Sequence, residues 1–256
     1  MVEVVGRDKF VKSLLPPLTG GKRVVLYGPI GIGKSAILHE VAKRLRTIGC
    51  PYGLASSTAT LHDITRALLQ VYPEYDIEEW SQQRIRGRMK IAAENRAGVL
   101  LLDHFQDIGT ASKGFLKQLW TLKIGILAAV DVEFPRDAAR FRSLKMTDKR
   151  IEVPPLDKDS MMTIFETAAG EHPLPRPPDD KERRAILRNA NGRPGWIKMM
   201  GQRAGKPRYW NDGRLLTGLL RIDVSSDIAG QYLGISFPKL DPRSSAPPAK
   251  VERGPV

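Results

Sequence analysis

The sequence predicts an α/β fold, in which a parallel sheet covered by helices is followed by a small all-helical domain. Short apolar segments alternate with stretches of helical periodicity as far as Pro154-Pro155, which is the pattern of βαβ units. From Asp159 onward the periodicity is helical only. A chain of 256 residues is long enough for one large domain and a second, smaller one.

Strands are expected at residues 23–27, 51–56, 99–102, 124–130 and 150–153. The runs 23–27, 99–102 and 124–130 are short and apolar, as strands buried on both faces of a sheet are. Helices are expected at residues 8–15, 35–45, 60–71, 77–96, 111–122 and 136–144. Pro16-Pro17 is expected to stop the first of these helices, and Gly49 to end the second.

The change of pattern predicts four parts. These are an α/β core over residues 1–155, a helical lid over 156–205, a basic extension over 206–237 and a flexible tail over 238–256. The lid is expected to hold helices at 159–169, 179–189 and 194–203, and residues 209–234 to form a helix with a short extended piece. The tail is rich in Pro, Ser, Lys and Arg, a composition typical of segments without a packed core.

The charge of the chain is strongly basic and unevenly placed. The net charge is +13, with 41 Lys and Arg against 28 Asp and Glu. Residues 181–222 alone contain eleven basic side chains and only two acidic ones, Glu182 and Asp212. A smaller basic run, Arg84, Arg86, Arg88 and Lys90, lies on the expected helix 77–96. Such clustering favours a polyanionic partner, most often nucleic acid, and the alternative is a basic surface that serves solubility.

Cysteine content and hydropathy indicate the compartment. Cys50 is the single cysteine, so a disulfide scaffold is excluded and a reducing cytoplasm is expected. The longest apolar runs, residues 97–102 and 124–130, are far shorter than the roughly 18 residues of a membrane-spanning helix. No membrane partner is therefore expected.

A phosphate-binding loop is the strongest motif of the sequence. Residues 28–35 match the pattern G-x-x-x-x-G-K-[ST] and lie between an apolar strand and a helix. Glycines let successive backbone N–H groups turn toward a phosphate, and the helix N-terminus adds a partial positive charge. The expected nucleotide-binding residues of this loop are Gly28, Pro29, Ile30, Gly31, Ile32, Gly33, Lys34, Ser35 and Ala36.

Three of the expected site residues have defined chemistry. Lys34 is expected to bridge the β- and γ-phosphates of ATP, and Ser35 to give an oxygen ligand to Mg²⁺. A loop of this type needs a carboxylate at the end of a neighbouring strand, and Asp103 follows the apolar run 99–102. Asp103 is therefore the second expected Mg²⁺ ligand.

The order of these motifs resembles that of AAA+ ATPases. The resemblance covers residues 3–205 and is strongest to the origin-recognition, transposition-regulator and STAND-like groups, which begin with a Val-Gly-Arg-acid motif. It implies an ATP-dependent, oligomeric ATPase. It further implies that Val5, Gly6 and Arg7 lie against the adenine, that Asp131 is the sensor-1 residue beside the γ-phosphate, and that Arg193 and Pro194 form the sensor-2 element of the lid. Arg140 or Arg142 falls where this family carries an arginine finger that reaches a neighbouring subunit.

Two positions depart from the family pattern. Asp131 replaces the usual Asn, Ser or Thr, and an acid there would repel a phosphate unless it is protonated or paired. His104 replaces the Glu that orients the attacking water. A histidine can accept a proton near neutral pH, or it can be a polar residue that only fills space. With either role, slow hydrolysis is expected, which suits a nucleotide-state switch.

Two classes of partner fit these observations. The first is DNA, bound by the basic residues of 181–222 and 84–90, with Trp196, Tyr209 and Trp210 either stacking on bases or packing within the protein. The alternative is a STAND-like signalling ATPase that assembles with a protein. A small-molecule kinase with the same loop is disfavoured, because an all-helical second domain suits a lid better than a substrate pocket.

Overall fold

The computed structural model describes residues 5–58, 60–71, 98–107, 123–133, 148–170 and 173–233, together with Arg84, Gly87, Ser112, Gly114, Phe115 and Lys117. The chain divides into two compact units. The first comprises residues 1–161 and 192–195, and the second comprises 162–191 and 196–256. The segment 192–195, which contains the expected sensor-2 residues, therefore packs with the first unit.

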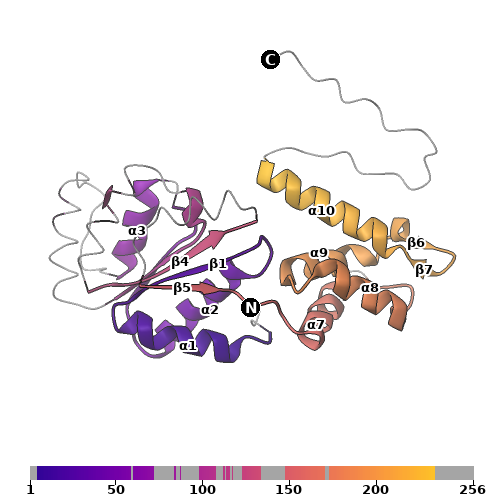
Figure 1. Ribbon diagram of the computed structural model, residues 1–256, viewed down its shortest axis with the longest axis horizontal. Coiled ribbons are helices and arrows are strands. Elements are labelled where there is room, and N and C mark those ends of the chain that lie inside the picture. Colours follow the sequence, from indigo (N-terminus) through magenta and orange to yellow (C-terminus); the bar gives the residue numbers. More distant parts are fainter. Residues whose placement is uncertain are drawn as a thin grey trace, which may run out of the picture. The chain divides into compact units, whose positions relative to one another are not determined.

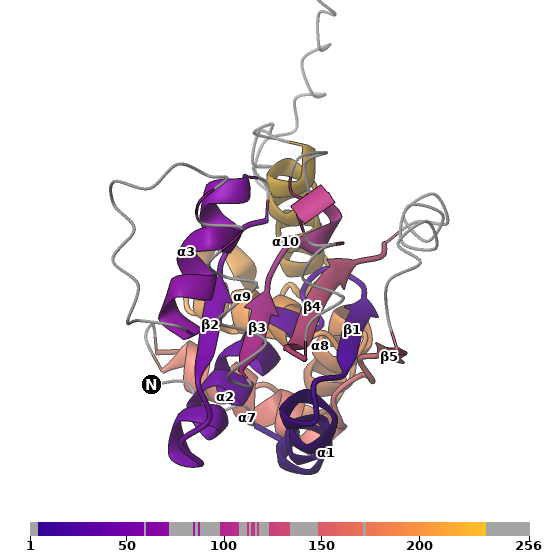
Figure 2. The same ribbon diagram turned by 90° about the vertical axis from the view of Figure 1, so that its left-hand side faces the viewer.

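The first unit is built on a five-stranded parallel sheet in the order β2-β3-β4-β1-β5 (Figures 1 and 2). Its strands are β1 (Arg23–Gly28), β2 (Tyr52–Ala55), β3 (Val99–Leu102), β4 (Gly125–Asp131) and β5 (Lys149–Glu152). The predicted α/β class and the five predicted strands are confirmed. Because all pairs are parallel, the carboxyl ends of β1, β3 and β4 meet at one edge of the sheet.

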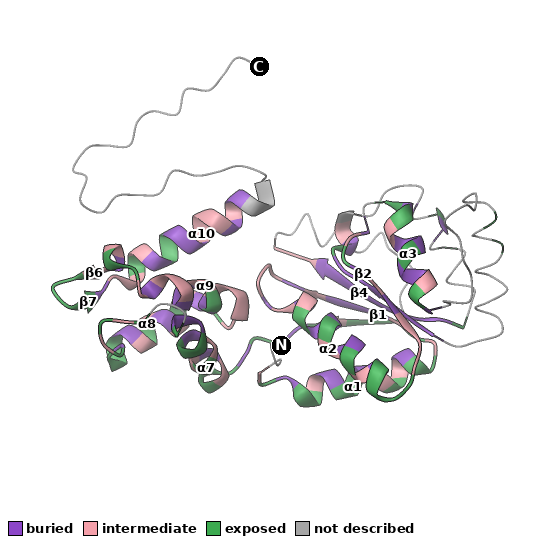
Figure 3. Ribbon diagram, turned by 180° about the vertical axis from the view of Figure 1, so that it is seen from behind, coloured by how far each residue is buried: buried purple, intermediate pink, exposed green. Residues whose placement is uncertain are grey.

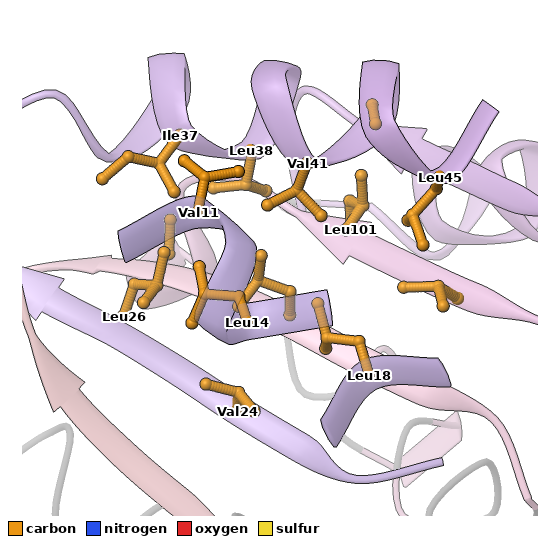
Figure 4. Close-up of a cluster of buried hydrophobic side chains, with 14 of the residues drawn as sticks. Val11, Leu14, Leu18, Val24, Leu26, Ile37, Leu38, Val41, Leu45 and Leu101 are labelled. Carbon is orange, nitrogen blue, oxygen red and sulfur yellow. The ribbon is translucent and has the colours of Figure 1, made fainter. Parts of the chain in front are cut away.

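Helices cover both faces of this sheet. Helices α1 (Asp8–Thr19) and α2 (Lys34–Thr47) bury their apolar side chains on one face, against alternate residues of β1, β3 and β4. Figure 4 shows this layer, with Leu14 and Leu18 of α1 among its labelled side chains. Helix α3 (Leu61–Val71) packs on the other face with Phe105 and Phe115.

Helix α1 is longer than the sequence indicates. It continues through Pro16-Pro17, which were expected to stop it, and ends at Thr19. Leu18 is fully buried in the same apolar layer as Leu14, so burial of one further turn favours the helix beyond the prolines. The fixed φ of proline is itself compatible with a helix, and the carbonyl of Pro16 still accepts a hydrogen bond from Gly20 N–H (3.0 Å).

The second unit contains four helices and a short hairpin among its described residues. The helices are α7 (Lys158–Ala169) and α9 (Pro194–Ala204), which both begin in the first unit, together with α8 (Asp180–Ala190) and α10 (Thr217–Leu233). The hairpin pairs β6 (Trp210–Asn211) with β7 (Arg214–Leu215) and follows the 3-10 turn η2 (Pro207–Tyr209). Each helix turns one side inward and leaves another exposed, as Figure 3 shows by colour.

Two buried acids hold this unit together. Glu182 caps α8 with Asp179, and also accepts hydrogen bonds from Arg176 and from Leu215 N–H of the hairpin. Asp223 of α10 accepts a hydrogen bond from the hydroxyl of Tyr209 (2.7 Å). Burial, followed by the hydrogen bond to Asp223, raises the pKa of Tyr209 to about 12.

Some predictions fall wholly or partly outside the described residues. The helix 136–144 and the tail 238–256 lie outside them. In the helices expected at 77–96 and 111–122, the few described residues are helical. No helix in the described part of the chain is long and apolar enough to cross a membrane. The limits of the expected core, lid, extension and tail stay predictions.

Candidate nucleotide-binding site

The phosphate-binding loop connects β1 to α2 at the carboxyl edge of the sheet. Gly31 and Gly33 have φ of +80° and +96°, a region that side chains with a Cβ rarely adopt. Gly33 is the N-cap of α2 and supplies no capping side chain, so the first amides of the helix stay available to an anion. The loop therefore has the backbone that its sequence motif requires.

Lys34 is buried under this loop and is held by three acceptors. Its ammonium lies 2.8 Å from Gly28 O, 2.9 Å from Pro29 O and 2.6 Å from Asp131 Oδ1. Burial lowers the pKa of Lys34, and the charges of Asp131, Asp103 and Glu133 oppose that shift. Asp131 thus contacts the lysine that the motif assigns to the phosphates, and the charges of Asp103 and Glu133 also act on it.

Asp131, the last residue of β4, is a paired acid. Burial alone would raise its pKa, but the nearby His104 imidazole and the charge of Lys34 outweigh burial, so the pKa of Asp131 lies below its usual value. The Gln106 amide donates a hydrogen bond to Asp131 Oδ2 (3.1 Å) and accepts one from Asp131 N–H (3.2 Å). The ion pair with Lys34 meets the condition under which an acid is tolerated beside a phosphate.

Asp103 and Ser35 are the hard oxygen donors of the site. Asp103 follows β3 and is 9% exposed, and its Oδ1 accepts a hydrogen bond from His104 N–H (2.9 Å). Ser35 is half-buried in the first turn of α2. Mg²⁺ at nucleotide sites keeps water and phosphate ligands and takes only one or two from the protein, so this pair fits it. No described group of three or more His, Cys, Asp and Glu forms a separate metal centre.

His104 lies beside this acidic cluster in an unusual backbone conformation. Its φ is +50°, its side chain is 51% exposed, and its Nδ1 lies 3.7 Å from Asp131 Oδ2. The hydroxyl of Thr58 fixes the turn by donating to His104 O (2.9 Å). The side chain is thus placed next to Asp131 and reaches solvent.

Arg7 comes from the segment before α1 and lies close to the phosphate loop. Its side chain is 5% exposed, and its Nη2 donates a hydrogen bond to Pro154 O (2.9 Å). Its Nη1 is buried and has no hydrogen-bond partner among the described residues. A Cβ placed on Gly33 would lie 4.0 Å from this nitrogen. Because an unsatisfied buried donor costs about 1–3 kcal/mol, Arg7 fits a nucleotide oxygen or ring nitrogen as its missing acceptor.

Pro194 and Gly195, which follow Arg193 and begin α9, pack against the phosphate loop. Gly195 N–H donates a hydrogen bond to Gly31 O (2.8 Å), and Pro194 Cγ would lie 3.6 Å from a Cβ on Gly33. Any side chain at position 195 would meet Gly31, because its Cβ would lie 3.0 Å from Gly31 Cα. The expected sensor-2 segment is therefore in direct contact with the phosphate loop.

Sequence reasoning missed Glu133, which links the loop to Arg193. Its Oε2 accepts a hydrogen bond from Ile30 N–H (3.0 Å), and its Oε1 accepts one from Arg193 Nη1 (3.0 Å). Glu133 lies two residues after Asp131. A second acid at this spacing, just beyond the end of β4, is the sequence signal that could have indicated it. The same reasoning gave no sign of Gln106.

The other expected residues are placed as follows. Val5 is half-buried and Gly6 exposed, just before Arg7, and Ala36 is exposed on α2. Arg140 and Arg142 lie outside the described residues, as do Arg86, Arg88 and Lys90. Arg84 is exposed and helical.

The aromatic residues considered for base stacking are packed within the second unit. Tyr209 is only 3% exposed, so the prediction that it stacks on nucleic acid bases is wrong. Trp210 is half-buried, donates a hydrogen bond to Ala204 O (2.6 Å) and has the Arg176 guanidinium over its ring. Trp196 is half-buried.

The basic residues of 181–222 form two groups. Four lie in ion pairs: Arg183 with Glu166, Arg193 with Glu133, Arg203 with Asp227, and Arg208 with Asp223. The other seven are exposed and in no ion pair with another described residue: Lys181, Arg184, Arg188, Lys198, Lys206, Arg214 and Arg221. Lys181, Arg184 and Arg188 recur at helical spacing along α8, so they line one face of it. We call these three residues the α8 stripe.

Comparison with known proteins agrees with this fold. Residues 24–122 match the AAA family, described as the ATPase family associated with various cellular activities. The structure of the Aeropyrum pernix Orc1 protein in complex with DNA is similar at a TM-score of 0.54 and 14% identity, over 90% of this chain and 68% of that one. The FIGL-1 AAA domain in complex with ADP gives 0.51 and 15%, over 91% and 88%.

A mutant of Thermotoga maritima RuvB is also similar, at a TM-score of 0.48 and 15% identity over 92% of this chain and 74% of that one. No curated protein sequence matches this chain. The strand order and the phosphate loop give the first unit the α/β fold of a P-loop NTPase core, and residues 24–122 of this unit are similar to the AAA family.

Proposed function

We propose that this chain is a slowly hydrolysing AAA+ ATPase that acts as a nucleotide-dependent switch on DNA, in the manner of a regulator of transposition or replication. One observation carries the proposal: the segment that contacts the phosphate loop follows directly after the helix that bears the α8 stripe. Helix α8 ends at Ala190, and Gly195, five residues later, donates its hydrogen bond to Gly31. A shift of the phosphate loop on nucleotide binding would therefore reach helix α8 of the second unit through a connection of only a few residues.

The nucleotide side of the proposal rests on groups whose partners ATP would supply. The open amides of α2 and the Lys34 ammonium provide positive charge for the phosphates. Arg7 Nη1 is buried and lacks an acceptor among the described residues. Ser35 and Asp103 would hold Mg²⁺, which neutralises phosphate charge when bound.

His104 bears on the rate of hydrolysis. A Glu at this position would be a fixed carboxylate directed at the attacking water, whereas His104 is half exposed and sits in a left-handed turn. Imprecise placement of a proton acceptor reduces catalysis strongly. Slow turnover and a long-lived ATP state follow from this.

The DNA side of the proposal rests on the α8 stripe. Arg184 and Arg188 are like charges four residues apart, which costs an isolated helix a few tenths of a kcal/mol. A polyanion removes that cost, and phosphates also bind the side chains directly. The similar Orc1 structure contains DNA, which is consistent with the proposal. A single free cysteine, Cys50, is consistent with a cytoplasmic setting.

The test compares DNA binding by two charge-matched triple variants. Duplex DNA binding is measured by fluorescence anisotropy over a range of salt, with ADP and with a non-hydrolysable ATP analogue. The variant Lys181→Gln, Arg184→Gln, Arg188→Gln is expected to reduce the slope of log affinity against log salt by about three. The control Lys9→Gln, Lys12→Gln, Lys43→Gln removes the same charge from exposed positions of α1 and α2 and is expected to keep the slope.

Two results would contradict the proposal. Equal slopes for both triple variants would exclude the α8 stripe as the DNA surface. Assembly driven by ATP and unchanged by DNA, measured by light scattering, would favour a protein partner instead.

A further inference from the structure

Glu133 connects the phosphate loop to Arg193 through two hydrogen bonds, and we call this pair of hydrogen bonds the Glu133 clasp. Its two carboxylate oxygens accept hydrogen bonds from Ile30 N–H of the phosphate loop and from the Arg193 guanidinium, both at 3.0 Å. The side chains of Glu133 and Arg193 are only 23% and 17% exposed. The carboxylate is therefore a largely buried anion held between the loop and the sensor-2 segment.

The backbone holds this clasp in position from both sides. Val132 N–H donates to Gly28 O (3.0 Å), which fixes the chain beyond β4 against the start of the loop. Gly195 N–H donates to Gly31 O (2.8 Å), which fixes the segment carrying Arg193 against the middle of the loop. All of these residues belong to the first unit. These two backbone hydrogen bonds therefore hold Glu133 and Arg193 next to the loop.

The donors that Glu133 occupies are those that a terminal phosphate needs. A loop amide and a guanidinium are typical ligands of phosphate oxygens, and a carboxylate binds the same donors with the same charge sign. Lys34 shows the same arrangement, because Asp131 holds its ammonium at 2.6 Å. Two acids at the end of β4 therefore hold two cations of the site.

We propose that Glu133 determines the preference of the site between ATP and ADP, by competing with the γ-phosphate for Ile30 N–H and Arg193. This inference rests on the proposed nucleotide-binding function. ADP lacks the phosphate that would compete, so it binds with the clasp closed. ATP binds with the clasp open, which releases Arg193 from Glu133 and transmits the nucleotide state to the segment that precedes α9. The clasp therefore costs ATP affinity and leaves ADP affinity unchanged.

The experiment measures binding of ADP and of a non-hydrolysable ATP analogue by calorimetry in four proteins. These are the wild type, Glu133→Gln, Arg193→Gln and the double variant. Glu133→Gln keeps the size of the side chain and removes its charge, so the affinity for the ATP analogue is expected to rise on the order of tenfold, with ADP affinity within about twofold. In the Arg193→Gln background the same substitution is expected to have a smaller effect, because Ile30 N–H is then the one remaining donor of the two for which Glu133 competes.

Glu152→Gln is the control for loss of one negative charge, since Glu152 is exposed at the end of β5 in the same unit. Thermal unfolding without nucleotide confirms that each variant is folded. If the wild type binds both nucleotides and Glu133→Gln leaves their affinity ratio unchanged, the inference is wrong and the proposed function stands. If the wild type binds neither nucleotide, the proposed function fails and the inference fails with it.

Discussion

Gly195 offers the sharpest test of how the phosphate loop communicates with the rest of the chain. A Cβ at this position would lie 3.0 Å from Gly31 Cα and 3.1 Å from Gly31 O, whereas ordinary contacts of a Cβ begin at 3.4 Å. Gly195→Ala would thus push the two backbones apart by a few tenths of an ångström. Both opposing atoms belong to backbone, so no side chain can rotate away.

The cost has two parts. Overpacking of a tight contact typically costs about 1–3 kcal/mol, and weakening the Gly195–Gly31 hydrogen bond adds about 1 kcal/mol. A local penalty of roughly 2–4 kcal/mol is enough to detach the segment 192–195 from the phosphate loop. Each 1.4 kcal/mol changes the equilibrium between the attached and the detached segment by a factor of about ten. We expect Arg193 to lose its place beside the loop.

The assay measures DNA affinity in the presence of the ATP analogue and in the presence of ADP, and the ratio of the two affinities is compared between variants. Gly195→Ala is expected to bring this ratio to within about twofold of one, while nucleotide-free DNA binding stays as in the wild type. Gly218→Ala is the control, because position 218 is exposed on α10 and nothing lies within 4 Å of a Cβ there. A Gly195→Ala protein that retains the wild-type ratio would refute the role given to this contact.

Two further predictions concern turnover and acid stability. Steady-state ATP hydrolysis by the wild type is expected to lie well below the roughly 1–1,000 per second of typical enzymes, and His104→Glu to raise it at least about tenfold; brisk turnover by the wild type would contradict this. The hydrogen bond from Arg23 lowers the pKa of Asp148 to about 2, so the folded state gains stability above about pH 4 that it loses as the pH falls toward 2. Asp148→Asn is therefore expected to flatten the pH dependence of the urea midpoint between about pH 4 and 2, and an unchanged dependence would show that this pair contributes nothing.

The sequence predicted most of the fold because the signals were local. Strands β1, β3 and β4 are short apolar runs, and the phosphate loop is a contiguous motif between a strand and a helix. The helix through Pro16-Pro17 was missed because its last turn depends on burial of Leu18 in a tertiary layer. Proline alone carries no information about that layer.

The chemistry of the site was less predictable because it depends on pairing between distant residues. Asp131 looked incompatible with a phosphate until its pairing with Lys34 was visible. Glu133 and Arg193 are 60 positions apart, and neither residue type suggests the other. Packing of the expected sensor-2 segment with the first unit likewise depends on the close approach of Gly195 to Gly31.

The central claim is that the loop over residues 28–35 holds the phosphates of ATP, with Lys34 as its cation. Calorimetry of ATP-analogue binding to Lys34→Ala tests it most directly, with Lys43→Ala, an exposed lysine of the same helix, as the control. Loss of a charge-assisted hydrogen bond, together with loss of the ion pair of Asp131 with Lys34, predicts at least about thirtyfold weaker binding by Lys34→Ala and no change by Lys43→Ala. Undiminished affinity in a folded Lys34→Ala protein would contradict the claim.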